Sequence, residues 1–251
     1  MRRIILFFIV ISFIFCGSLL AQSPDDVYRK ANLSYEDEEY EEAVSLYETL
    51  IQMDKISPEV FYNLANSLFK LKKIGRTIVN YERALRLAPR DKDALLNLKL
   101  ARSMAVDKIE TPEKGFLLNL ILFPYDRLTV NELTVFVSAF YLLIVLFLIF
   151  SIFFVEKRIV IFYNIGILTF LLIIFSIFLA SKIHNENFAR EAIVISEKVN
   201  VRSGPKDDYL LQFTLHEGTK VRIVEERQLW YEIDLSKDLR GWLPKDSVEI
   251  I

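Results

Sequence analysis

The residues that could carry out catalysis are few and scattered along this chain of 251 residues. His184 and His216 stand apart from each other and from the single cysteine, Cys16. The sequence has no Gly-rich phosphate loop, no GxSxG turn and no HExxH helix, so the common patterns for phosphate binding, acyl transfer and zinc-dependent hydrolysis are missing. We therefore expect no catalytic residues, no metal site and no cofactor, and we predict that the protein is not an enzyme.

Acidic residues are dense in the stretch "YEDEEYEEA" (35–43), where two carboxylates could in principle form an acid/base pair. A run of this kind is more simply explained as the solvated face of a helix. His216 comes just before a strand turn, where polar surface residues are common. We interpret the acidic run and His216 as solvent-exposed surface residues, not as parts of a catalytic site.

A second group of residues has the chemistry of binding and recurs with a fixed period. Residues 25–103 match themselves when shifted by 34 positions. The matching pairs are Tyr28 with Tyr62, Ala31 with Ala65, Asn32 with Asn66, Tyr35 with Phe69, Tyr47 with Tyr81 and Leu50 with Ala84. This period, with small residues where helices cross, is typical of tetratricopeptide repeats. We predict a repeat domain over 22–103, made of two repeats and a capping helix at 93–102.

The first helices of such repeats line a concave face, and aromatic and amide side chains there suit a peptide or a partner helix. The predicted partner-binding groove consists of Tyr28, Asn32, Tyr35, Tyr62, Asn66 and Phe69. For Tyr35 and Phe69 a place in the core is an equal alternative. Charge is also uneven: residues 22–60 are strongly acidic and 61–115 basic, which either holds the repeats together or steers a partner.

Long apolar runs occur at 133–155 and 159–180, and each exceeds the roughly 20 residues that a bilayer core requires. The first 21 residues have the positive start and apolar stretch of a secretory signal peptide. Lipidation of Cys16 and an uncleaved signal anchor remain the alternatives. With 53% hydrophobic and 25% charged residues, the composition favours a multidomain membrane protein with a two-helix transmembrane hairpin.

The turn between the runs, 156–158, contains Lys157 and Arg158. Positive residues beside membrane spans remain in the cytoplasm, so we predict that these two residues determine the topology. The signal sequence agrees, because it exports the repeat domain. We expect an interfacial juxtamembrane segment at 104–132, a linker at 181–189, and both soluble domains on the periplasmic or extracytoplasmic side of the bacterial inner membrane.

The C-terminal part, 190–251, contains short β-rich segments separated by turn residues and predicts a small all-β, SH3-like barrel. Four motifs, "VNVRSGP", "HEGTKVRIVEE", "LWYEI" and "RGWLP", occur there in the order and spacing of the bacterial SH3 (SH3b) family, which this segment resembles. The candidate ligand surface consists of Trp230, Tyr231 and Trp242. Its tryptophans could equally be core residues.

The order of signal, tetratricopeptide pair, two spans and SH3b resembles the BatE-type proteins of the aerotolerance (Bat) operon. The resemblance implies protein partners, among them von Willebrand A-domain membrane proteins of the same operon, and a role in envelope stress tolerance. The near-neutral net charge of −2 argues against nucleic acid. We therefore predict a membrane adaptor. A peptidoglycan-binding sensor, or an accessory subunit of a wall-remodelling enzyme, is the alternative.

Overall fold

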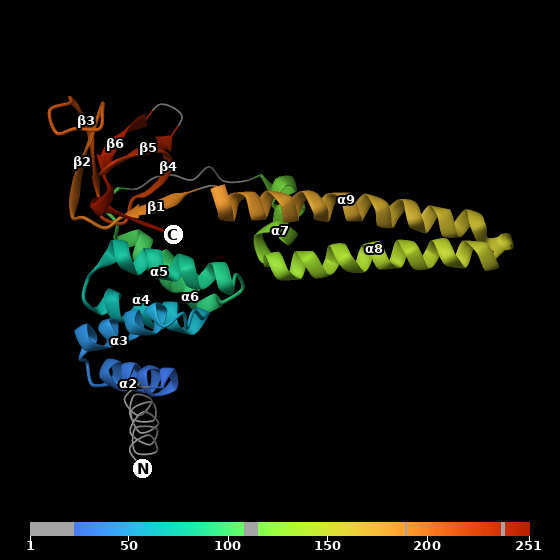
Figure 1. The fold of residues 1–251 in the computed structure, drawn as a ribbon, viewed down its shortest axis with the longest axis horizontal. Coiled ribbons are helices and arrows are strands. Elements are labelled where there is room, and N and C mark those ends of the chain that lie inside the picture. The colour runs from blue at the N-terminus through green and yellow to red at the C-terminus, as the bar shows by residue number, and fades with distance from the viewer. Residues whose placement is uncertain (1–22, 108–114, 189, 237–238) are drawn as a thin grey trace, which may run out of the picture.

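The computed structural model describes residues 23–107, 115–188, 190–236 and 239–251. The predicted signal peptide and Cys16 lie outside these residues. Figure 1 shows three parts: a stack of helices, a curled β-sheet packed on one end of the stack, and a long hairpin of two helices that projects from the side.

The stack is built from helices whose bounds repeat along the chain. They are α2 (Pro24–Glu36), α3 (Tyr40–Gln52), α4 (Pro58–Lys70), α5 (Ile74–Leu87) and α6 (Lys92–Met104). The side chains of Ser23, Ser57 and Asp91 accept hydrogen bonds from the first turns of α2, α4 and α6, which satisfies otherwise unpaired N–H groups. These caps are spaced 34 residues apart, so the period found in the sequence is also a period of the structure.

The turns inside the pairs repeat as well. Glu38 and Lys72, again 34 apart, both have positive φ, at 63° and 60°. The sequence suggested that the acidic run 35–43 is one solvated face of a helix. It is not, because α2 ends at Glu36 and a turn separates it from α3. Ala31 and Ala65 are fully buried where the helices of each pair cross, as the small side chain at that position predicts.

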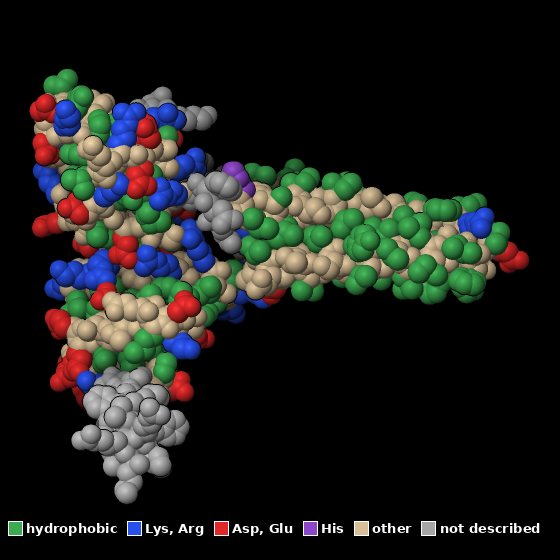
Figure 2. All heavy atoms as spheres, in the orientation of Figure 1, with side chains coloured by type: hydrophobic (Ala, Val, Ile, Leu, Met, Phe, Trp, Pro, Cys, Tyr) green, Lys and Arg blue, Asp and Glu red, His purple; other side chains and the backbone are tan. Residues whose placement is uncertain are grey.

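The hairpin consists of α8 (Val130–Phe153) and α9 (Arg158–Phe188), joined by the short 3-10 helix η1 (Val155–Lys157). At 1.5 Å per residue, α8 is about 36 Å long and α9 about 46 Å, against roughly 30 Å for a bilayer core. Both are long and apolar enough to cross a membrane, and few of their side chains are buried. Hydrophobic side chains cover the hairpin in Figure 2, whereas charges gather on the stack and sheet.

The structure adds three details to what the sequence predicted for the hairpin and its flanks. Helix α8 begins earlier than 133 because Thr129 and Glu132 form a capping box at its start. The expected linker 181–189 is helical as far as Phe188. The segment predicted to be juxtamembrane, 104–132, contains the helix α7 (Phe116–Arg127), whose Tyr125 ring packs 5.9 Å from Phe178 of α9.

The C-terminal part is a seven-stranded antiparallel sheet among the described residues, in the order β3-β2-β6-β5-β4-β1-β7. The strands are β1 (Glu191–Val194), β2 (Lys198–Arg202), β3 (Leu211–His216), β4 (Lys220–Arg227), β5 (Trp230–Ser236), β6 (Leu239–Pro244) and β7 (Val248–Ile250). Strand β3 lies almost wholly outside the four family motifs, although Leu211, Phe213 and Leu215 alternate with polar residues. The sheet surrounds one apolar core that includes Val201, Ile233 and Leu243.

Candidate functional site

The predicted groove residues of the first repeat form a polar ladder between helices. Tyr47 of α3 donates a hydrogen bond from its hydroxyl to Asn32 Oδ1 at 2.6 Å. Asn63 of α4 donates from Nδ2 to the Tyr28 hydroxyl at 3.2 Å and to Asn32 Oδ1 at 3.3 Å. The Tyr28 and Asn32 side chains thus bind α2 to both of the helices that follow.

The second repeat copies this ladder one repeat further on. Tyr81 of α5 donates to Asn66 Oδ1 at 2.5 Å, and Asn97 of α6 donates to the Tyr62 hydroxyl at 3.1 Å. Burial raises the pKa of Tyr81, and also that of Tyr47, well above the ordinary value. These hydroxyls are therefore protonated hydrogen-bond donors at neutral pH.

The remaining two groove residues also pack inward. The Tyr35 ring lies 5.5 Å from the ring of Tyr40, and Phe69 packs against the core between α4 and α5. All six predicted residues are thus half-buried. The hydrogen bonds that their side chains form with other described residues are all made within the stack. Only the exposed outer part of each ring or amide could contact a partner.

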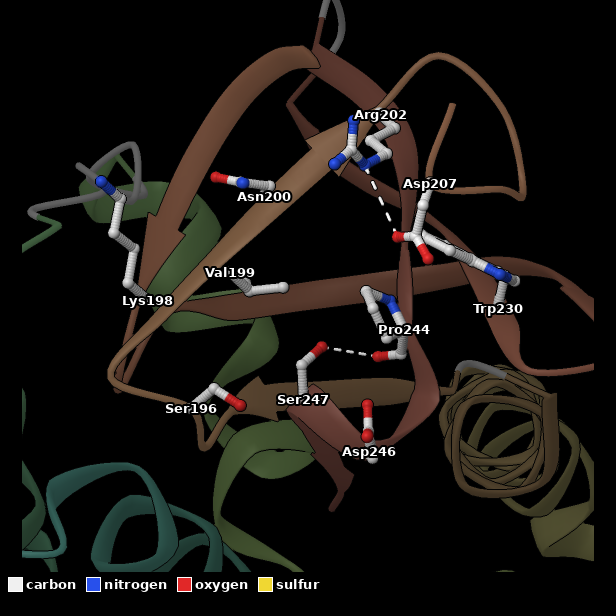
Figure 3. Close-up of a pocket in the computed structure, with 10 residues that line it drawn as sticks. All are labelled: Ser196, Lys198, Val199, Asn200, Arg202, Asp207, Trp230, Pro244, Asp246 and Ser247. Carbon is white, nitrogen blue, oxygen red and sulfur yellow. Dashed lines mark hydrogen bonds and ion pairs between the residues drawn. The ribbon is translucent and has the colours of Figure 1, made fainter. Parts of the chain in front are cut away.

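A pocket of about 300 Å³ opens on the β-sheet domain (Figure 3). It combines an indole with charges of both signs and amide and hydroxyl groups. Its lining consists of Ser196, Lys198, Val199, Asn200, Arg202, Asp207, Trp230, Pro244, Asp246 and Ser247. Such a set can stack on one face of a ligand and pair with both an amine and a carboxylate, which suits a peptide or a glycan-peptide.

One side of this pocket is held in place by local contacts. Arg202 donates from Nη1 to the Tyr209 carbonyl at 2.9 Å, and its Nε lies 3.9 Å from Asp207 Oδ1. Trp230 pairs with Pro244 across β5 and β6, so its position follows from the register of the two strands. The Trp230 ring is half-buried and remains available to a ligand.

The other two residues of the predicted ligand surface lie elsewhere. Tyr231 belongs to the core of the sheet. Trp242 is only 7% exposed, and the Arg227 guanidinium lies 5.1 Å from its ring, an arrangement that favours cation–π attraction. Of the three predicted residues, Trp230 alone lines the pocket.

The helix stack and the sheet share a hydrophobic core that the sequence did not predict. Ile78, Val79 and Tyr81 of α5 lie in one buried cluster with Ile193 of β1 and Ile251. The backbones approach closely: a Cβ added to Gly75 would lie 2.4 Å from the Val194 carbonyl oxygen. The two domains therefore form a single body rather than independent modules.

Polar contacts seal the edge of this junction. Arg83 of α5 donates to Glu249 Oε1 at 2.7 Å and to the Ile250 carbonyl at 2.5 Å, and Arg86 donates to the Ile251 oxygen at 2.7 Å. The Gly75 N–H donates to Glu217 Oε1 at 2.9 Å. Charge-assisted bonds of this kind fix orientation as well as adding stability.

A third contact links the chain just after α6 to the turn between β3 and β4. Asp107 accepts a hydrogen bond from the His216 backbone N–H at 2.8 Å and from the Thr219 hydroxyl at 2.7 Å, and its Oδ1 lies 2.9 Å from His216 Nδ1. Partial burial alone would raise the pKa of Asp107, but the bonds from Thr219 and His216 lower it below the ordinary value. His216 is thus a junction residue and not the plain surface residue expected from sequence.

Lys157 and Arg158, predicted to determine topology, lie at the far end of the hairpin from the stack and sheet. Arg158 donates from Nε to the Ser151 carbonyl at 2.9 Å, which closes the connection between α8 and α9. Among the described residues no cluster of three His, Cys, Asp or Glu side chains is arranged to hold a metal ion.

Comparison with known proteins identifies one part of the chain. Residues 197–249 match the family described as Bacterial SH3 domain, which confirms the resemblance read from the four motifs. A search of curated proteins found no match to the chain.

Proposed function

We propose that the protein is a non-enzymatic membrane adaptor whose repeat domain and SH3b domain act together on the outer side of the bacterial inner membrane. Bacterial SH3 domains bind peptidoglycan or proteins, which supplies one half of the proposal. The other half assigns α2–α6 to the tetratricopeptide class, on the 34-residue period of caps, turns and tyrosine–asparagine bonds. That class binds protein partners.

The observation that carries the proposal is the core shared by α5 and β1. Domains packed through a common core lie on the same side of a membrane. The chain between them must then cross an even number of times, and α8 and α9 supply two helices of sufficient length. With Lys157 and Arg158 at the tip inside the cell, the body lies outside.

A cysteine-accessibility experiment tests this topology. In a Cys16→Ser background, Lys206→Cys on the sheet domain should react with a membrane-impermeant maleimide in intact spheroplasts. Lys157→Cys should react only after lysis. Reaction of Lys157→Cys in intact spheroplasts would overturn the assignment.

Domain order, together with these features, supports membership of a Bat-type envelope complex. The expected partners are the von Willebrand A-domain membrane proteins encoded nearby. Affinity purification of the full chain in detergent should recover them, and the double variant Tyr28→Ala, Tyr62→Ala should not. Both hydroxyls form hydrogen bonds within the stack. A melting curve of this variant is therefore needed to show whether it fails to recover partners because it lost a binding contact or because it unfolded.

The pocket around Trp230 favours a second candidate function, a sensor that holds peptidoglycan. Isolated sacculi should then sediment the detergent-solubilised full chain, and Trp230→Ala should weaken sedimentation. The full chain is the right sample, because an isolated sheet domain would expose Ile193 and Ile251. Sacculi that leave the wild-type chain in the supernatant would favour purely protein partners.

A further inference from the structure

Helix α6 occupies the position of a first helix in a third repeat. Its capping residue, Asp91, stands at the position of Ser23 and Ser57 in the first two repeats. Its Asn97 donates a hydrogen bond to Tyr62 as Asn63 donates one to Tyr28. In the two complete repeats the next helix along the chain packs against the first. After α6, Asp107 instead accepts a hydrogen bond from the His216 N–H of the sheet domain, and the chain then continues to α7 and the hairpin.

The face that would receive a second helix can be identified by the 34-residue offset. In α2 and α4 this face contains Tyr28 with Asn32, and Tyr62 with Asn66, which contact Tyr47 of α3 and Tyr81 of α5. The equivalent residues of α6 are Leu96 and Leu100. They are 66% and 51% exposed, so nothing described covers them.

Further apolar side chains are exposed beside Leu96 and Leu100. Leu95 and Met104, at 43% and 52% exposure, extend the strip formed by Leu96 and Leu100 along α6. A helix that caps a stack normally shows a polar outer face, whereas these four apolar side chains are exposed on α6. We name Leu95, Leu96, Leu100 and Met104 the α6 apolar strip. Exposed strips of this kind mark interaction surfaces.

Charge indicates what covers the strip. Lys99 stands where Ala31 and Ala65 are fully buried against the second helices of their own repeats. Lys99 is exposed and makes no ion pair within the described parts of the chain. Its aliphatic stem can lie along an incoming helix while the ammonium pairs with a carboxylate.

We propose that the α6 apolar strip binds an amphipathic helix of a partner protein, about as long as the 13 residues of α3, with an acidic residue opposite Lys99. This helix takes the place of a second helix, but farther from α6 than at the Ala31 and Ala65 crossings, because Lys99 is larger than alanine. A second copy is disfavoured as donor, because the second helices α3 and α5 are held in their own cores by buried Tyr47 and Tyr81. The inference deepens the proposed adaptor function by naming the surface and the chemistry of one partner.

A single reporter on the strip tests the proposal. The full chain carries Cys16→Ser and Leu96→Cys, labelled with an environment-sensitive fluorophore, in detergent. The probe is the acidic peptide YEEAVSLYETLIQ (residues 40–52), whose sequence already serves as a second helix in this chain. The matched control peptide has the same composition in scrambled order.

The expected result is a saturable blue shift with the probe and none with the scrambled peptide. Lys99→Glu should weaken binding at least about tenfold, which corresponds to about 1.4 kcal/mol or more, because it replaces the cation that pairs with the probe. Lys206→Glu, an exposed charge change on the sheet domain, should leave binding unchanged. Equal binding by the Lys99→Glu and Lys206→Glu chains would contradict the proposal.

Two other occupants give distinct results. If lipid covers the strip, the reporter is already shifted in phosphatidylglycerol nanodiscs without peptide. If a second copy covers it, the shift appears with rising protein concentration alone. Either result, or no response to the probe, overturns the partner-helix proposal. Recovery of partner proteins by the full chain would still stand in that case, so the two failures are distinguishable.

Discussion

Arg83 in α5 donates a hydrogen bond of 2.7 Å to Glu249 in β7, although 166 positions separate the two residues in the sequence. The whole apolar hairpin lies between them in the chain. The contact therefore ties the first and last parts of the protein into one body and places the hairpin as an excursion from it.

Removal of this contact should destabilise both domains at once. We expect Arg83→Ala to lower the free energy of unfolding by about 1.5–3 kcal/mol, because it removes hydrogen bonds to a carboxylate and to a carbonyl. Both tryptophans, Trp230 and Trp242, lie in the sheet domain. A shift in the unfolding transition followed by their fluorescence would therefore show that a substitution in α5 destabilises the sheet domain.

The matched control for Arg83 is Arg29→Ala, which breaks an exposed ion pair with Asp26 at the other end of the stack. Exposed pairs contribute about 0–1 kcal/mol, so the tryptophan transition should hardly move. Equal effects of Arg29→Ala and Arg83→Ala would show that the junction contact has no special weight.

The shared apolar core should be the larger part of the coupling. Ile193 is fully buried against α5, and Ile193→Ala should cost about 2–5 kcal/mol through lost burial and a residual cavity. Leu229→Ala, on a side chain that is 76% exposed, should stay within about 0.5 kcal/mol. Urea titration followed by helical circular dichroism measures whether the α-helices unfold with the sheet.

The tyrosine–asparagine ladder should be structural as well as a binding feature. Tyr81→Phe removes the donor to Asn66 Oδ1 and should lower stability by about 1–3 kcal/mol, because a polar group within the stack loses its partner. Tyr209→Phe, on an exposed loop, is the control. If Tyr81→Phe leaves the free energy of unfolding unchanged, water replaces the lost hydroxyl.

Asp107 should make the junction sensitive to acid. Its pKa is lower in the folded protein than its ordinary value of 3.8, so its contribution to stability is complete above that value and is lost as the pH falls through the folded pKa. Melting temperatures should therefore fall more steeply for the wild type than for Asp107→Asn once the pH falls below about 4, in a series from pH 7 to about 2. If the two curves of melting temperature against pH run parallel, Asp107 does not contribute to the loss of stability in acid.

Much of the architecture could be predicted because it depends on local spacing. The 34-residue period predicted the paired helices, and Ala31 and Ala65 are buried where those helices cross. An apolar run of sufficient length predicted each hairpin helix. The SH3b motifs identified the sheet domain. The start of α8 was missed because a capping box, not hydrophobicity, determines it.

The candidate sites were less predictable, since side-chain direction depends on packing. Trp230 and Trp242 look alike in sequence, yet Trp230 lines a pocket and Trp242 lies buried under Arg227. The amides of Asn32 and Asn66 were expected to face a partner, but their Oδ1 atoms accept hydrogen bonds from tyrosines of the stack.

The sequence by itself determined the parts: paired helices with a fixed period, two helices long enough to span a bilayer, and a small β domain. Each rests on interactions between residues close in the chain, which leave a periodic or continuous pattern. Only the tertiary structure decided that the helix stack and the sheet share a core, and that the α6 apolar strip is exposed among the described residues. Contacts such as Ile193 on α5 join residues more than a hundred positions apart, and a contact at that separation leaves no pattern in a single sequence.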